Sequence, residues 1–163
     1  MAMMVHLEIE GATSGKISEK CSLKKGREDT VEVYELDQEL EIPAHGSDGR
    51  AGGHRVHKPL VFFKAIDRSS PLLANSLASN EKLTLTFRFY RSNPDGDGKE
   101  EQFYTIKIED ARLCSYKGRL PNVRDRAQSD LPPMERVEVI FGKITNTFER
   151  DGVIFTDDWN APR

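Results

Sequence analysis

Cysteine is scarce in this sequence. Only two of the 163 residues are cysteines, Cys21 and Cys114, and they stand far apart along the chain. A framework of disulfides is therefore excluded, and a chain of this length does not need one, because it buries roughly 70% of its unfolded surface. A single Cys21–Cys114 disulfide stays open, but two separate small core residues are the favoured interpretation.

Long apolar runs are also missing. No stretch approaches the ~20 consecutive apolar residues that a membrane-spanning helix needs, so we expect no membrane insertion. The first ten residues carry no basic residue, and Glu8 and Glu10 interrupt their apolar character. The sequence therefore predicts no cleavable signal peptide and a cytoplasmic start.

The chain has no excess of charge of either sign. Lys and Arg together number 24 against 27 Asp and Glu, which gives a formal net charge of -3. General affinity for nucleic acid needs a concentrated basic face, so this balance argues against a nucleic-acid partner. With 37% hydrophobic and 31% charged residues, the composition is typical of one globular domain, which we place at residues 1–163.

Signals for enzymatic chemistry are absent as well. No serine lies in a nucleophile-elbow pattern, and neither cysteine has a local catalytic signature. Asp157 and Asp158 are adjacent near the end of the chain, which is poor geometry for an acid–base pair. The sequence thus predicts a protein that is not an enzyme and has no catalytic residues.

Three patterns could hold a metal or an anion, and each has a simpler interpretation. Residues 93–98 match the opening of a calcium loop, but the twelfth position is Tyr104, so a hairpin turn is predicted. His54 and His57 lack zinc-ligand spacing and are expected to be solvent-exposed or at an interface. The glycine-rich residues 49–53 precede a strand and not the helix of a phosphate loop. We expect no metal and no cofactor.

Residues 52–73 contain the clearest boundaries between a loop, a strand and a helix. A polar, glycine-rich loop leads into a strand over 55–66, in which residues 60–63 form an apolar run expected to be buried on both faces. A helix over 70–79 follows, with Ser69 or Ser70 as its cap and Pro71 in its first turn.

Period-2 alternation predicts strands over most of the remaining chain. Two of them, 30–42 and 135–148, change phase along their length, which indicates a β-bulge or a bend at a barrel corner. In 135–148 the change falls at Gly142. The predicted strands are 5–10, 30–42, 55–66, 82–91, 102–113, 135–148 and 153–156, with a tail from 157 to 163.

This pattern predicts a mainly β fold. The strands do not alternate with helices, so the sheet should be antiparallel, and long bent strands favour a closed β-barrel or a tightly coiled two-sheet barrel. One short α-helix should pack on its side. A monomeric barrel that binds a small molecule is the alternative function, but the inward-facing set is bulky and would fill a narrow barrel: Leu83, Leu85, Phe87, Phe89, Ile106 and Ile108.

Five segments in order along the chain carry a family resemblance. They are residues 55–59 (RVHKP), 64–73 (KAIDRSSPLL), 83–91 (LTLTFRFYR), 103–107 (FYTIK) and 157–159 (DDW). Together they resemble the Hcp (haemolysin co-regulated protein) family, the tube protein of the bacterial type VI secretion system. The run at 64–73 is fairly specific, and the likeness covers nearly the whole chain.

The resemblance implies a small β-barrel with one helix alongside it. Members of the family assemble into hexameric rings that stack into a tube, and a contractile sheath propels the tube from the cell. The implied partners are further copies of the chain, the sheath and spike proteins, and effector proteins held in the lumen. Such export after cytoplasmic assembly would also explain the missing signal peptide.

Two groups of residues are expected to make the contacts of that assembly. The loop 43–55 is long and has no apolar anchor, so we expect it to project from the ring and to contact the next ring. Its polar contacts are assigned to Asp48, Arg50, His54 and Arg55. The resemblance also marks Asp157, Asp158 and Trp159 as residues of subunit or tail contacts.

Overall fold

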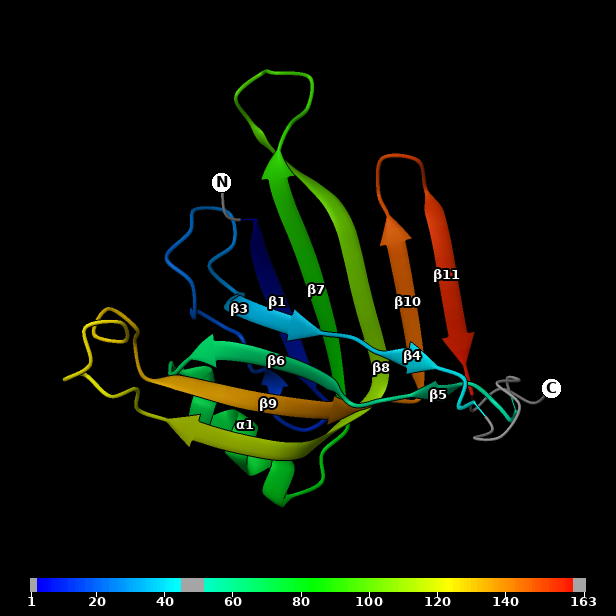
Figure 1. Ribbon diagram of the computed structural model, residues 1–163, viewed down its shortest axis with the longest axis horizontal. Helices are drawn as coiled ribbons and strands as arrows, with labels where there is room; N and C mark the ends of the chain where they lie inside the picture. Colours follow the sequence, from blue (N-terminus) through cyan, green and yellow to red (C-terminus); the bar gives the residue numbers. More distant parts are fainter. Residues whose placement is uncertain (1–2, 45–51, 160–163) are drawn as a thin grey trace.

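The computed structural model describes residues 3–44 and 52–159, which form β-strands around a single core and one helix (Figure 1). In chain order the elements are β1 (Met4–Gly11), β2 (Gly15–Lys16), β3 (Val31–Asp37), β4 (Leu40–Glu41), β5 (Val56–His57), β6 (Leu60–Ala65), α1 (Ser69–Ala78), β7 (Leu83–Ser92), β8 (Glu100–Arg119), β9 (Met134–Ile140), β10 (Lys143–Phe148) and β11 (Val153–Asp158).

Six antiparallel strands close a barrel in the order β8-β7-β1-β3-β6-β9, and β9 pairs back onto β8. The 20-residue strand β8 makes this closure possible, because its first part pairs with β7 and β10 and its last part pairs with β9. Between the two parts Asp110 adopts a φ of 49°, a left-handed conformation that Asp tolerates better than most residues. The predicted closed barrel with one short helix is confirmed.

The core lies inside the barrel. Alternation places one side-chain row of each strand inward, so that Leu7 and Ile9 of β1 meet Leu85 and Phe87 of β7. Phe62 and Phe87 pack edge to face with their ring centroids 5.6 Å apart. Bulky side chains thus fill the interior, as in other narrow barrels, which leaves the small-molecule alternative without support.

The strand predictions were wrong at three breaks. The strand expected over 30–42 divides into β3 and β4 at Gln38 and Glu39, and β4 lies outside the main sheet. The strand expected over 55–66 divides into β5 and β6 at Lys58 and Pro59, where proline removes a backbone donor and the chain leaves the main sheet. The strand expected over 135–148 divides into β9 and β10 at Phe141 and Gly142. The phase change at 30–42 was interpreted correctly, since a register shift lies between Val33 and Glu35.

Burial also differs from expectation at several positions. β6 is buried on one face only, because Leu60 and Phe62 point inward while Val61 and Phe63 are half-exposed. Cys114 is exposed and Cys21 is half-buried, so the prediction of two core cysteines was wrong for Cys114; both are free thiols. The expected tail residues Asp157 and Asp158 instead belong to β11.

An ionic network joins the helix to the barrel. Lys64 and Glu135, both fully buried, form an ion pair across β6 and β9. The Lys64 ammonium also donates to Asp67 at 2.9 Å and to the Ser70 hydroxyl at 3.2 Å. Burial and the hydrogen bond that Tyr116 donates to Glu135 raise the pKa of Tyr116 to about 12. The buried charges of Lys64 and Glu135 therefore neutralise one another.

The start of α1 is capped by a residue other than the predicted serines. The Asp67 carboxylate accepts hydrogen bonds from the Ser69 N–H at 2.8 Å and the Ser69 hydroxyl at 2.6 Å. The Ser70 hydroxyl accepts from the Asp67 N–H at 3.0 Å. The Asp67 carboxylate thus satisfies one of the helix N–H groups that lack an internal partner, and it is favourably placed at the positive end of the helix.

The end of α1 is joined to the turn after β1 through Glu81. Its carboxylate accepts from the Ser14 N–H at 2.6 Å, the Thr13 N–H at 2.7 Å and the Ser76 hydroxyl at 2.9 Å. Burial alone would raise the pKa of Glu81, but the hydrogen bonds from Ser14 and its neighbours lower it overall. A Cβ atom at Gly11 would lie 2.5 Å from this carboxylate, so a larger residue there would displace Glu81 from its hydrogen bonds.

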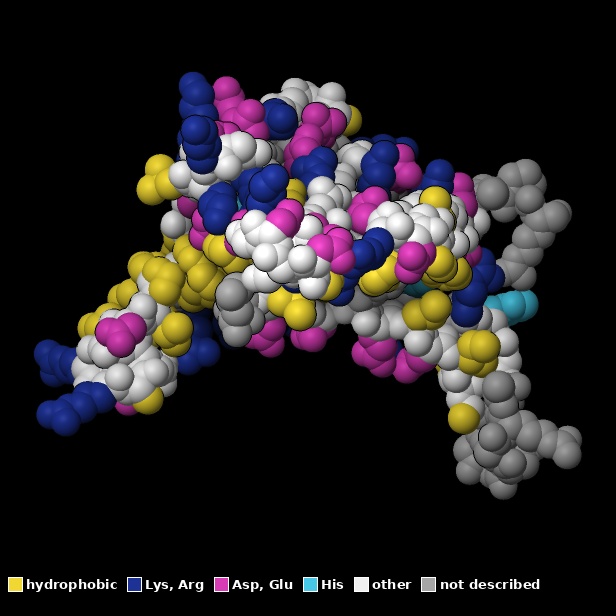
Figure 2. Space-filling model, turned by 90° about the horizontal axis from the view of Figure 1, so that it is seen from above, with side chains coloured by type: hydrophobic (Ala, Val, Ile, Leu, Met, Phe, Trp, Pro, Cys, Tyr) yellow, Lys and Arg dark blue, Asp and Glu magenta, His cyan; other side chains and the backbone are white. Residues whose placement is uncertain are grey.

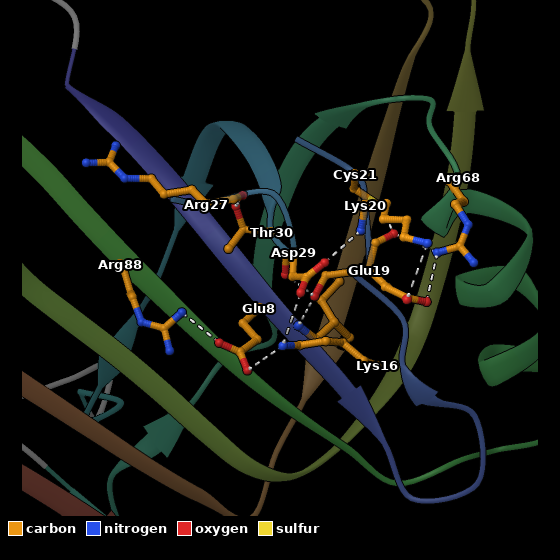
Figure 3. A network of polar contacts seen from close by, with 12 residues as sticks. Glu8, Lys16, Glu19, Lys20, Cys21, Arg27, Asp29, Thr30, Arg68 and Arg88 are labelled. Atoms are coloured by element: carbon orange, nitrogen blue, oxygen red, sulfur yellow. Dashed lines mark hydrogen bonds and ion pairs between the residues drawn. The ribbon is translucent and has the colours of Figure 1, made fainter. Parts of the chain in front are cut away.

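Ion pairs hold the polar segment between β1 and β3 (Figure 3). The Glu8 carboxylate on β1 lies 2.8 Å from the Arg88 guanidinium on β7 and 3.7 Å from the Lys16 ammonium. At the far end of the segment, Arg68 donates to the backbone oxygen of Glu19 at 2.7 Å. The segment is therefore anchored both to the barrel and to the residue that precedes α1.

No helix in the described part of the chain is long and apolar enough to cross a membrane.

The buried pair gives a stability prediction. Lys64→Met should lower the free energy of unfolding by about 3–5 kcal/mol, because it leaves the Glu135 carboxylate buried without its cation. Urea denaturation at one fixed protein concentration measures this loss. Lys143→Met is the matched control: the Lys143 side chain is 39% exposed and its ammonium lies 3.6 Å from Glu109, so its loss should cost less than about 1 kcal/mol. Equal losses in the two variants would contradict the interpretation.

Candidate assembly surface

The predicted stacking loop rises from a short stem. β4 and β5 form a two-stranded sheet of their own, separate from the main sheet, at the right of Figure 1. Further along, the Gly52 N–H donates to the backbone oxygen of Pro43 at 3.2 Å. The Lys58 ammonium bridges Glu39 and Glu41 at 3.1 and 3.3 Å. We call residues 39–44 and 52–58 the stem.

The end of β11 contacts this stem through a carboxylate. The Nε and Nη2 groups of Arg55 donate to the two oxygens of Asp157, and His57 Nε2 lies 2.9 Å from Asp157 Oδ2. The Asp157 side chain is only 10% exposed. The hydrogen bonds from Arg55, opposed by burial and assisted by His57, hold the pKa of Asp157 well below its ordinary value.

Aromatic rings extend this contact to the barrel. Trp159 stacks on the imidazole of His57, with ring centroids 4.7 Å apart and an interplanar angle of 27°. Phe141, a core residue between β9 and β10, lies 5.2 Å from Trp159. The backbone N–H of Trp159 donates to the backbone oxygen of Gly142 at 3.2 Å. We call Arg55, His57, Phe141, Asp157 and Trp159 the Asp157 cluster.

A groove of about 540 Å³ lies beside the cluster. Its charged walls are already engaged within the chain: Arg112 donates to the backbone oxygen of Asn80 at 2.6 Å, and Asp110 pairs with Lys82 at 2.9 Å. These groups therefore act as structural donors and acceptors. The other residues that line the groove are Arg55, Val56, His57, Lys58, Pro59, Ile140, Phe141, Gly142 and Trp159.

The structure brings part of the predicted contact set together. Arg55, assigned to the loop, pairs with Asp157, assigned to the tail, although about a hundred residues separate them. His54 is exposed, and Asp48 and Arg50 lie outside the described residues.

Sequence reasoning missed His57 and Phe141. His57 was expected to be solvent-exposed or at an interface, but its side chain is only 5% exposed and lies under Trp159. A usable signal was present: Arg55 and His57 are two residues apart within the strand predicted over 55–66, and Asp157 and Trp159 are likewise two residues apart in the sequence. Residues two apart on a strand share a face, so two matching pairs could have been recognised.

Two apolar surfaces lie at opposite ends of the long axis of the molecule. In Figure 2 hydrophobic side chains gather around the 120–133 segment at the left and again over the stem, β10 and β11 at the right. Each side chain in the two sets is at least 44% exposed. The loop flank comprises Tyr34, Ile66, Leu120, Val123 and Leu131, and the hairpin flank comprises Leu40, Ile42, Val153, Ile154 and Phe155.

Comparison with known proteins agrees with this geometry. A family model described as "Type VI secretion system effector, Hcp" matches residues 7–148. The chain belongs to the Hcp family. The Major exported protein of Pseudomonas aeruginosa is 33% identical to it, over 99% of this chain and 98% of the relative.

Solved Hcp structures share the whole fold. A crystal structure of an Hcp protein matches with a TM-score of 0.91 at 29% identity, over 99% of this chain and 100% of the other. The secreted protein Hcp3 from Pseudomonas aeruginosa matches with a TM-score of 0.79 at 30% identity, over 98% and 100% of the two chains. As an Hcp, the chain is a tube subunit of the type VI secretion system.

Two of the segments that carried the resemblance now have physical roles. The run at 64–73 supplies Lys64, Asp67 and Ser70 to the buried ionic network, and its Leu73 is fully buried in the core. The run at 55–59 supplies Arg55 to the cluster, where it meets the Asp157 of the last segment. These Hcp motifs thus join elements that are distant in sequence.

The low pKa of Asp157 gives a pH prediction. A carboxyl group whose pKa is lower in the folded state stabilises the fold above its unfolded pKa, about 3.9, and this contribution is lost as the pH falls through the folded pKa. Wild type should therefore be more stable than Asp157→Asn near pH 7, and the difference should shrink below about pH 4. Urea denaturation of both proteins from pH 7 to pH 2 measures it. A difference that grows on acidification would refute the ion pair.

Proposed function

We propose that this Hcp assembles into a closed hexameric ring, and that rings stack into the tube that is exported with effector proteins in its lumen. The number six and the tube partners, namely the sheath, the spike and the effectors, come from the family resemblance. The observation that carries the ring is the pair of unlike apolar surfaces at opposite ends of the molecule.

The loop flank offers a concave apolar surface. A groove of about 490 Å³ runs between the barrel wall and the 120–133 segment, and among its lining residues are Tyr34, Phe63, Pro121, Leu131 and Met134. Exposed apolar side chains around a groove are typical of protein–protein contact sites. A neighbouring copy would remove this surface from water.

The hairpin flank offers a different kind of surface. β11 is the last strand of the main sheet and pairs only with β10 among the described strands, so its outer edge has backbone groups without a strand partner. Val153 and Phe155 on that strand are 64% and 45% exposed. An exposed apolar edge strand favours association with another chain.

Two unlike surfaces determine the symmetry. A two-fold dimer uses one self-complementary patch twice, whereas a contact between two different patches repeats head to tail and closes into a ring when the rotation allows. The loop flank of one copy and the hairpin flank of the next satisfy the second case. The ring therefore uses both flanks of every subunit.

The second contact of the tube, between rings, is assigned to the 43–55 loop with Asp48, Arg50, His54 and Arg55. Its stem leaves the main sheet, and His54 is exposed. Glu35, Asp37 and Glu39 are exposed along β3 and at the start of the stem, and these carboxylates supply partners for polar contacts. Trp159 stacks on His57 of the stem, so the end of the β11 segment, with Asp158 and Trp159, is assigned to the same contact.

A charge placed on the hairpin flank tests the ring. Phe155→Arg should weaken association about thirtyfold (~2 kcal/mol), because a charged guanidinium would replace the Phe155 aromatic side chain, which we expect at the centre of the contact between subunits. Light scattering over a concentration series should show smaller species, with an unchanged circular dichroism spectrum.

The matched control is Leu23→Arg. Leu23 is fully exposed and belongs to neither flank, so this variant should assemble as wild type does. If Phe155→Arg and Leu23→Arg associate equally well, the hairpin flank is not part of the ring contact.

A further inference from the structure

The stem has little support of its own. It is a two-stranded sheet in which only two residue pairs are in register, Leu40 with His57 and Glu41 with Val56. An isolated two-stranded hairpin is at best marginally stable in water. Contacts from elsewhere in the chain must therefore fix its position against the barrel.

The end of β11 provides those contacts. Arg55 and His57, both at the β5 side of the stem, share Asp157 as their hydrogen-bond acceptor. The Nδ1 atom of His57 has no hydrogen-bond partner among the described residues, so Asp157 is the polar anchor of that ring. Trp159 covers the imidazole and is itself anchored to Gly142 and packed near Phe141.

Both guanidinium contacts of Arg55 are with Asp157 of its own chain. A direct contact between Arg55 and a second ring would first have to break this pair. The charge-assisted bidentate geometry makes that costly, because such hydrogen bonds are among the strongest in proteins. Of the four residues assigned to the contact between rings, Arg55 therefore acts within its own subunit, where it supports the loop that carries the other three.

We propose that the end of β11 is a latch that holds the stem of the 43–55 loop against the barrel, with Arg55 and Asp157 as positioning residues for the contact between rings. This inference rests on the proposed stacking role of the loop. A stem fixed before docking loses less conformational freedom when rings meet, so the latch strengthens stacking without touching the next ring.

Trp159 reports on the latch directly, because it is the only tryptophan in the chain. In Arg55→Gln the stem should release the end of β11, with a red shift of the Trp159 emission and stronger quenching by acrylamide. Rings should still form, because the variant leaves both apolar flanks intact. Export from cells with a working type VI machinery should fall about tenfold, the population shift expected for loss of a charge-assisted contact.

Arg55→Lys keeps the charge but not the two-point contact, so its emission and export should lie between those of wild type and Arg55→Gln. The matched control is Arg91→Gln, which removes a similarly half-buried guanidinium paired with Glu101 at 2.8 Å. It should leave the Trp159 emission and export unchanged. A deletion of residues 45–51 provides the reference for loss of the loop.

The outcomes separate the two ideas. If the deletion exports normally, the stacking role of the loop is wrong, whatever Arg55→Gln does. If the deletion blocks export but Arg55→Gln leaves the Trp159 emission at the wild-type value, the latch is wrong and the stacking role stands. If the emission shifts while export is unchanged, the latch exists but does not position the loop for stacking, and the inference is overturned.

Discussion

Closure of the barrel by β8 is the constraint from which the rest of the molecule follows. This strand pairs with β7 and β10 before its bend at Asp110 and with β9 after it. The barrel can therefore close through β9 while β10 and β11 continue the sheet outside it. Because of that continuation, apolar residues of β11 are exposed to solvent in the single chain, and a contact with a second chain would bury them.

The same closure places the Asp157 cluster. Because β9 turns into β10 at Phe141 and Gly142, β11 runs back toward this corner and ends beside the stem. Asp157 then meets Arg55 and His57. The inferred latch is thus a consequence of the strand order. A ring contact through the hairpin flank and a stacking contact through the stem would use neighbouring parts of one structural unit, β10–β11 with the stem.

The fold could be predicted from the sequence because period-2 alternation is local information. Strands such as β7 show their inward row directly, and the phase change near Val33 marked a true bulge. The break at Pro59 was missed because the alternation continues on both sides of it. The phase change at Gly142 was interpreted as a bulge or bend within one strand, although it marks the boundary between β9 and β10. Lys64 was also missed as a core residue: a lysine is buried only when partners such as Glu135 and Asp67 come from elsewhere in the fold.

The candidate site was less predictable for a related reason. Family resemblance pointed to Arg55, Asp157 and Trp159, but their association depends on the pairing of β10 with β11 and on the corner at Gly142. The hydrophobic alternation along one strand does not tell which residues of two strands pair with one another. The two-residue spacing could have marked His57, whereas Phe141 is recognised as part of the cluster only from the structure, in which it packs against His57 and Trp159.

In the ring that we propose, neighbouring subunits cover the two apolar flanks that the single chain exposes. Negative-stain electron microscopy of the purified wild-type protein, combined with sedimentation at high micromolar concentration, tests it most directly. We expect ring-shaped particles with six-fold symmetry and a mass six times that of the 18.5 kDa chain. A stable monomer under the same conditions would contradict it.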